Sequence, residues 1–105
     1  MHNFVIIMSR TRIGAMLESA NTLDILLYVH DHPMCLRSDI YRNVSRNAHT
    51  REKIDMLCDE SLLIMEPAGK GNRCVLTITE KGRRIVCLLL EAEETLRHGV
   101  DEDLR

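Results

Sequence analysis

Residues that can read the edges of base pairs lie close together at positions 45–53. Arg46 and Asn47 can each form two hydrogen bonds with one base, and Glu52 can accept a hydrogen bond from cytosine. Ala48 is small enough to allow a close approach and can touch a thymine methyl group. Because these residue types fit the major groove, the stretch predicts contact with double-stranded DNA.

A second group, His30, His32 and Cys35, contains three residues of metal-ligating type. Zinc sites usually combine two pairs of ligands from separate parts of a chain, and no clear second pair is present. An ordinary loop at the end of a helix is therefore the favoured interpretation. We expect no metal site and no other cofactor.

The four cysteines form no CxxC pair and are expected to be free thiols in a reducing compartment. Cys58 and Cys87 fall on apolar faces of predicted helices, which indicates core packing. The sequence also has no GxSxG motif, no P-loop and no glycine-rich nucleotide turn after a strand. A binding protein without catalysis is expected.

The spacing of apolar residues predicts helices over residues 4–20, 22–30, 39–43, 46–60 and 80–98. The candidate N-caps of the last four, in chain order, are Asn21 or Thr22, Ser38, Ser45 and Thr79. An extended piece spans residues 34–36. Two strands, 62–66 and 74–79, flank a glycine-containing turn at 67–73 and predict a β-hairpin.

The last predicted helix is apolar at the six successive positions 85–90. Six successive residues point in every direction around a helix. One face of the helix can pack on the domain, but the opposite face needs another element to cover it. The N-terminal segment, a second subunit or both can provide it. We expect a homodimer with an interface from the first and last helices that contains Ile13, Met16, Leu17, Val86, Leu89, Leu90 and Leu96.

Three stretches resemble the winged helix-turn-helix transcriptional regulators of the broad MarR and PadR types: residues 36–40 (LRSDI), 54–57 with 62–64 (IDML and LLI) and 76–82 (LTITEKG). The last is the most specific. The resemblance covers about residues 22–90. It implies a fold that is mainly α with a small β-hairpin (α+β), with a three-helix core, a wing, and N- and C-terminal helices for dimerisation.

One departure from the pattern is Ser61, at a position that is often glycine in such proteins. Ser61 must end the preceding helix differently or bear some strain, because it lacks the access of glycine to the left-handed region.

The chain of 105 residues is long enough for one domain. Within it, we expect an N-terminal segment at 1–20, the helix-turn-helix and wing at 22–79, the dimerisation helix at 80–98 and an acidic tail at 99–105.

The resemblance further implies sequence-specific binding of double-stranded DNA and transcriptional regulation as a homodimer. The helix at 46–60 would enter the major groove, and the wing at 66–74 would meet the backbone or the minor groove. The expected DNA-binding residues are Arg37, Ser38, Arg42, Ser45, Arg46, Asn47, His49, Arg51, Glu52, Lys53, Lys70 and Arg73. The alternative is a winged-helix module for protein–protein contacts without DNA binding, since one fold serves several functions.

The distribution of charge agrees with a polyanionic partner although the net charge is −2. Residues 34–84 carry ten Lys or Arg against seven Asp or Glu, whereas residues 85–105 carry two against six. Only three residues are aromatic, which argues against the base-stacking surfaces of RNA-binding and single-strand-binding proteins.

The apolar run at 4–8 is too short to span a bilayer, and no signal-peptide cleavage pattern follows it. We therefore expect a cytoplasmic protein without a membrane partner. A small-molecule effector would fit a regulator of this kind, and no residue points to its identity.

Overall fold

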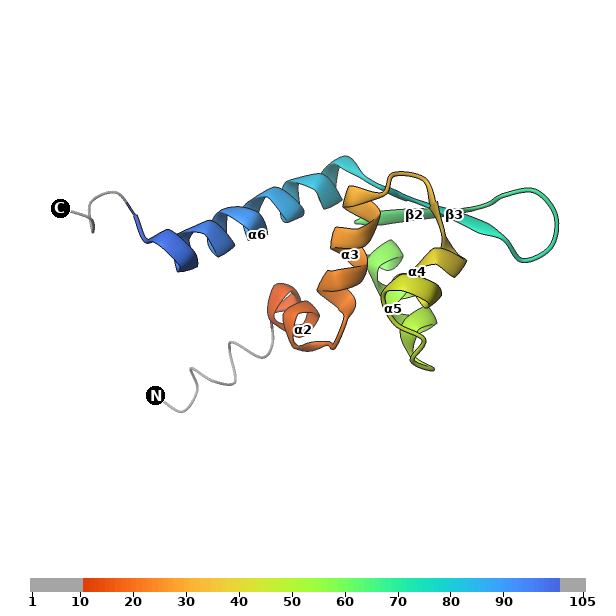
Figure 1. The fold of residues 1–105 in the computed structure, drawn as a ribbon, viewed down its shortest axis with the longest axis horizontal. Coiled ribbons are helices and arrows are strands. Elements are labelled where there is room, and N and C mark those ends of the chain that lie inside the picture. Colours follow the sequence, from red (N-terminus) through yellow and green to blue (C-terminus); the bar gives the residue numbers. More distant parts are fainter. Residues whose placement is uncertain (1–10, 101–105) are drawn as a thin grey trace.

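The computed structural model describes residues 11–100. This part of the chain is built from helices and three strands (Figure 1), in the order α2 (Arg12–Glu18), α3 (Thr22–Asp31), β1 (Cys35–Leu36), α4 (Arg37–Asn43), α5 (Thr50–Asp59), β2 (Leu63–Pro67), β3 (Cys74–Ile78) and α6 (Glu80–His98). The order confirms the predicted α+β fold. Residues 4–10 of the first predicted helix lie outside the described residues.

One apolar core joins α3, α4, α5, the sheet and the first half of α6. Ile25, Leu26 and Val29 of α3 are fully buried, at the spacing expected for one face of a helix. The neighbouring elements add Ile40, Ile54, Leu57, Leu63, Leu76 and Val86. Each such side chain contributes about 1.5–3 kcal/mol when it is buried, so the core fixes the elements around it.

The strands form an antiparallel sheet in the order β1–β3–β2. Leu76 of the central strand pairs with Cys35 on one side and with Met65 on the other. Strands β2 and β3 form the hairpin that we call the wing, residues 63–78, and its turn lies at the end of the molecule opposite the C-terminal end of α6 (Figure 1).

Helix α5 begins at Thr50, four residues later than predicted, so the prediction that Ser45 is its N-cap is wrong. The Oγ of Ser45 accepts a hydrogen bond from the backbone N–H of Asn47 (3.1 Å), and the Oδ1 of Asn47 accepts one from the N–H of His49 (2.8 Å). Such local bonds favour a turn over a helix. Arg46 and Asn47 therefore lie in the turn that leads into α5, and not in the helix itself.

Helix α4 begins at Arg37, so the prediction that Ser38 is its N-cap is wrong. The backbone N–H of Leu36 donates a hydrogen bond to the Oδ2 of Asp39 (2.9 Å). This carboxylate closes the first turn of the helix from inside, as the acidic residue of a capping box does.

The link between α5 and β2 depends on Ser61, which has a left-handed backbone with φ of 63°. The N–H of Ser61 donates to the carbonyl oxygen of Cys58 (2.9 Å), and the N–H of Leu62 donates to that of Leu57 (2.9 Å). This is the hydrogen-bond pattern with which a glycine often ends a helix. Ser61 thus bears the strain that its side chain predicts.

A glycine is required at position 82, where α6 leaves the sheet. A Cβ atom there would lie 2.3 Å from the carbonyl oxygen of Leu62 and 2.7 Å from the Cγ1 of Ile78. The Leu62 oxygen has little room to move, because it accepts a hydrogen bond from the N–H of Thr79 (3.0 Å). This close approach explains why the LTITEKG stretch ends in glycine.

Replacing Ser61 by Gly should raise the free energy of unfolding by about 1 kcal/mol, because the left-handed conformation no longer carries a Cβ atom. Urea denaturation followed by circular dichroism measures the change. Ser61→Ala is the control, since it keeps the Cβ and should give no increase. An unchanged or lower stability of Ser61→Gly would contradict the strain.

Gly82→Ala should lower the free energy of unfolding by about 1–3 kcal/mol through overpacking, although alanine is the better helix former. The control is Arg83→Ala on the exposed neighbouring position, which should change stability little. Equal denaturation midpoints for the two variants would show that the contact with Leu62 is not restrictive.

Candidate nucleic-acid interface

The inner face of α5 is fixed by Ile54 and Leu57, which are fully buried in the core. The residues at the start of the helix and in the turn before it are exposed as a result. We call this exposed set the α5 front, and it consists of Arg46, Asn47, Ala48, His49, Arg51 and Glu52. The residues that the sequence singled out for base recognition therefore lie together at one end of α5.

Two side chains next to the α5 front hold the turn in place. Thr50 is buried, and its hydroxyl donates to the carbonyl oxygen of Ser45 (3.3 Å) and lies 3.2 Å from the Oγ of Ser45. Ser45 is also the acceptor for the N–H of Asn47. Ser45 thus has a structural part in the turn, which presents the neighbouring Arg46 outward.

Two ion pairs lie along the outer side of α5. The Nδ1 of His49 lies 3.1 Å from the Oε1 of Glu52, and the Nε of Arg51 lies 3.3 Å from the Oδ1 of Asp55. All four side chains are largely exposed, so each pair contributes little to stability and can open to meet a ligand.

Five exposed cations lack a hydrogen-bond or ion-pair partner among residues 11–100: three lie near α5 and on the wing, and two, Arg83 and Arg84, lie near the start of α6. Within residues 11–100, the side chains of Arg46, Lys70 and Arg73 make no hydrogen bond and no ion pair. Arg42, in contrast, is paired with Asp39 at 2.8 Å. Uncompensated positive charge therefore lies on the turn before α5, on the turn of the wing and near the start of α6.

The turn of the wing is shaped by two glycines. Gly69 and Gly71 have φ of 80° and 79°, and the N–H of Ala68 donates to the carbonyl oxygen of Arg73 (2.9 Å) to close the turn. Lys70 lies between the glycines and Arg73 follows them, which places both cations at the tip of the hairpin.

Lys53 lies on α5 as expected, but its side chain contacts the protein itself. Its Nζ donates to the carbonyl oxygen of Ala20 (2.5 Å), in the turn between α2 and α3. This contact braces α5 against the preceding elements, and we leave Lys53 out of the candidate interface.

A shallow hollow separates α4 from the wing and brings in residues that the sequence did not single out. Tyr41 and Asn72 line it with Arg37, Ser38, Arg73 and Cys74. Tyr41 lies one helical turn after Arg37, and this spacing was the available signal. The sequence carries no comparable signal for Asn72, because α4 contacts its backbone carbonyl and not its side chain.

The expected dimer residues divide into two groups. Ile13, Leu17, Leu90 and Leu96 are exposed, Leu96 at 85%, and Leu89 is half-buried. Met16 and Val86 are instead buried in the core of the chain itself, at 4% and 0% exposure. These two are therefore unavailable to a second subunit, because the first subunit already covers them.

Among residues 11–100, no helix is long and apolar enough to cross a membrane.

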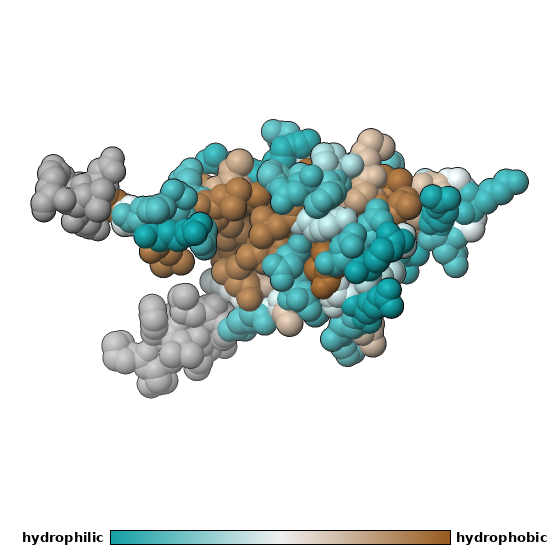
Figure 2. Space-filling view, viewed as in Figure 1, coloured by the Kyte–Doolittle hydropathy of each residue, from teal (hydrophilic) through white to brown (hydrophobic). Residues whose placement is uncertain are grey.

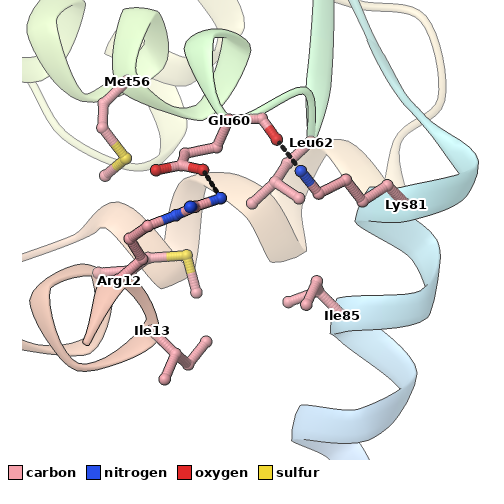
Figure 3. Close-up of a pocket in the computed structure, with 8 residues that line it drawn as sticks. Arg12, Ile13, Met56, Glu60, Leu62, Lys81 and Ile85 are labelled. Carbon is pink, nitrogen blue, oxygen red and sulfur yellow. Dashed lines mark hydrogen bonds and ion pairs between the residues drawn. The ribbon is translucent and has the colours of Figure 1, made fainter.

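Apolar residues gather between α6 and α2 in the space-filling view, whereas the tip of the wing is hydrophilic (Figure 2). A pocket opens in this region (Figure 3), between α2, the end of α5 and the start of α6. Its walls are mostly apolar and include Ile13, Met56 and Ile85. At its rim, Arg12 pairs with Glu60 at 3.1 Å, which ties α2 to the residue that follows α5.

The group of possible metal ligands is not assembled into a site. Within the described residues, no three His, Cys, Asp or Glu side chains come together to hold a metal ion. His30 contacts Asp31, and the ring of His32 stacks on Tyr28 with 4.0 Å between the ring centres.

The cysteines differ in their surroundings. Burial raises the pKa of the Cys35 and Cys58 thiols, and nearby carboxylates raise both further. Cys87 is exposed, so its predicted place in the core is wrong. It lies on the side of α6 that the domain does not cover.

The fold is similar to that of MarR in its crystal structure. The TM-score is 0.69, the sequence identity is 18%, and the match covers 99% of this chain and 77% of the MarR chain. No family model matches the chain, and no curated protein matches its sequence. The chain thus has the winged-helix fold of MarR, as the resemblance implied.

Proposed function

We propose that the protein binds double-stranded DNA as a homodimer and regulates transcription without catalysis. Helix α5 enters the major groove with the α5 front, and the wing lies on the backbone or in the minor groove. The observation that carries the proposal is that three of the exposed cations without a partner among residues 11–100, Arg46, Lys70 and Arg73, lie at the two elements that a winged helix brings to DNA.

The distribution of charge along α5 supports this orientation. The front end combines Arg46 and Arg51 with the positive end of the helix dipole, which favours an approaching phosphate. Glu52 of the α5 front pairs with His49, and the other acidic residues of α5 lie further along, where Asp55 pairs with Arg51 and Glu60 pairs with Arg12. Most of the negative charge is therefore placed away from the groove and partly neutralised.

The residues divide into three roles in this arrangement. Side chains of the α5 front read base edges, with Arg46 as the principal reader. Lys70 and Arg73 contact phosphates or the minor groove, and Ser38 and Arg42 of α4 contact the backbone. Ser45 shapes the turn, and Asn47 offers a base its amide nitrogen and the second lone pair of its Oδ1, which already accepts from His49.

We place the dimer interface on one row of side chains along α6. Ile85, Leu89, Ala92 and Leu96 follow one another at intervals of four, three and four residues, which places them in one row along the helix. The domain covers only the start of this row, and Leu96 lies on the part of α6 that extends away from the core (Figure 1). A second α6 packed along the row would cover it.

Binding to DNA is tested first by fluorescence anisotropy with duplexes selected from a random pool. The logarithm of the affinity should fall steeply with the logarithm of salt concentration between about 50 and 200 mM, because phosphate contacts release counterions. No binding to any duplex at low salt would contradict the proposal and favour a role in protein–protein contacts.

The two proposed roles separate in two variants. Arg46→Ala should weaken binding to the best duplex by about 1–3 kcal/mol and affect unrelated DNA less, because it removes a base contact. Lys70→Ala should weaken all sequences alike and reduce the salt slope by about one. Arg97→Ala, at the far end of α6, is the control and should change neither quantity. Equal losses for Arg46→Ala on all sequences would refute its assignment to a base.

Dimerisation is tested by analytical ultracentrifugation. Leu96→Glu should weaken self-association by about tenfold or more, because a charge replaces an apolar side chain that each subunit buries. Glu94→Lys changes charge on the opposite side of α6 and is the matched control. A dimer that tolerates Leu96→Glu would exclude the α6 row as the interface.

A further inference from the structure

The side chain of Arg37 joins α4 to two separate parts of the wing. Its Nη2 donates to the backbone carbonyl oxygen of Asn72 at 2.9 Å, and its Nη1 lies 3.8 Å from the Sδ of Met65. One planar guanidinium thus contacts strand β2 and the turn at 68–73 together.

The hydrogen bond from Arg37 to Asn72 links the turn of the wing to α4. Among residues 11–100, the bond from Arg37 to Asn72 is the one hydrogen bond that joins the turn at 68–73 to an element outside the wing. The other bond of the turn, from Ala68 to Arg73, lies within it. The tip of the wing therefore depends on Arg37 for its position relative to α4.

Arg37 is itself held firmly at its backbone. It follows directly on Leu36, which pairs with Val75 of β3 and donates its N–H to Asp39. Ile40, in the same short helix, is fully buried. The guanidinium consequently projects from a fixed point toward a hairpin tip that has few other supports.

Arg42, the other arginine of α4, has a different environment. Its Nη1 pairs with Asp39 at 2.8 Å within the same helix, and its side chain is 60% exposed. It makes no contact with the wing among the described residues. The two arginines therefore offer a matched comparison between a cation tied to the wing and one that is not.

We infer that Arg37 is a positioning residue that sets the place of the wing, and with it the place at which Lys70 and Arg73 meet DNA. The inference rests on the proposed function and deepens it. It differs from the initial expectation that Arg37 is itself a DNA-binding residue, because two of its nitrogen atoms already face the wing.

We expect a lysine to replace arginine poorly in this role, because one ammonium cannot contact the Asn72 oxygen and the Met65 sulfur at the same time as two guanidinium nitrogens do. The guanidinium presents several donors in a planar fork, whereas an ammonium is a single point of charge. A direct contact to phosphate, in contrast, is largely retained when arginine is replaced by lysine, since phosphate accepts either cation. Arg37→Lys therefore distinguishes positioning from direct contact.

The test is a set of double-mutant cycles measured by anisotropy with the selected duplex. Arg37→Ala should lower the affinity about tenfold, and Arg37→Lys should lower it nearly as much. Lys70→Ala should then have less than about half of its usual effect (in log affinity) in the Arg37→Ala background, because the displaced wing no longer brings Lys70 to DNA. In the Arg42→Ala background, Lys70→Ala should keep its full effect.

Additive losses for Arg37→Ala and Lys70→Ala, or near-normal binding by Arg37→Lys, would overturn the inference. A second measurement separates this outcome from failure of DNA binding itself. Backbone ¹⁵N order parameters of residues 68–73, recorded without DNA, should fall in Arg37→Ala and stay unchanged in Arg42→Ala. Unchanged order parameters in Arg37→Ala would refute the positioning role whether or not the protein binds DNA.

Discussion

The burial of Ile54 and Leu57 is the contact on which the candidate interface depends. These two side chains fix α5 against the core with one face inward, so the polar residues at its start must face outward. The turn before the helix adds a second constraint. Because Thr50 is buried and bonded to Ser45, the residues between them are held as an exposed loop. The burial of two apolar side chains thus determines which polar residues at the start of α5 are exposed.

At the other end of the molecule, the small size of the domain limits how much of α6 it covers. The domain covers the first turns of α6, where Val86 is buried, but no element among residues 11–100 lies along the rest of the helix. Ile13 and Leu17 of α2 remain exposed nearby for the same reason. The hydrophilic wing and the apolar α2–α6 region therefore lie at different parts of the surface (Figure 2). The proposed DNA contact and the proposed dimer contact can thus form on one molecule without overlap.

The sequence predicted the parts of the fold that follow from hydrophobic period and turn chemistry. The hairpin, the long last helix, the strain at Ser61 and the overall winged-helix fold are of this kind. The start of α5 could not be found in this way, because Ser45 and Asn47 are equally good at capping a helix and at closing a turn. The choice between them depends on the burial of Thr50 and on its hydrogen bond to Ser45.

The candidate site was predicted less completely than the fold. A cationic residue in a suitable stretch does not show what its side chain contacts, and three cations illustrate this. Among residues 11–100, Arg46 has no hydrogen-bond or ion-pair partner, Lys53 is bonded to Ala20, and Arg37 is bonded to Asn72, 35 residues further along the chain. Met16 and Val86 were assigned to an interface from spacing alone, and only packing shows that the chain buries them itself.

The most direct measurement is an NMR titration of the ¹⁵N-labelled protein with a selected duplex of about 30 base pairs, long enough for two half-sites. The account predicts that the largest amide shifts occur at residues 45–53 and 68–73, while the α2–α6 region changes little. Shifts confined to α2 and α6, or no shifts at low salt, would contradict the claim that the α5 front and the wing bind DNA.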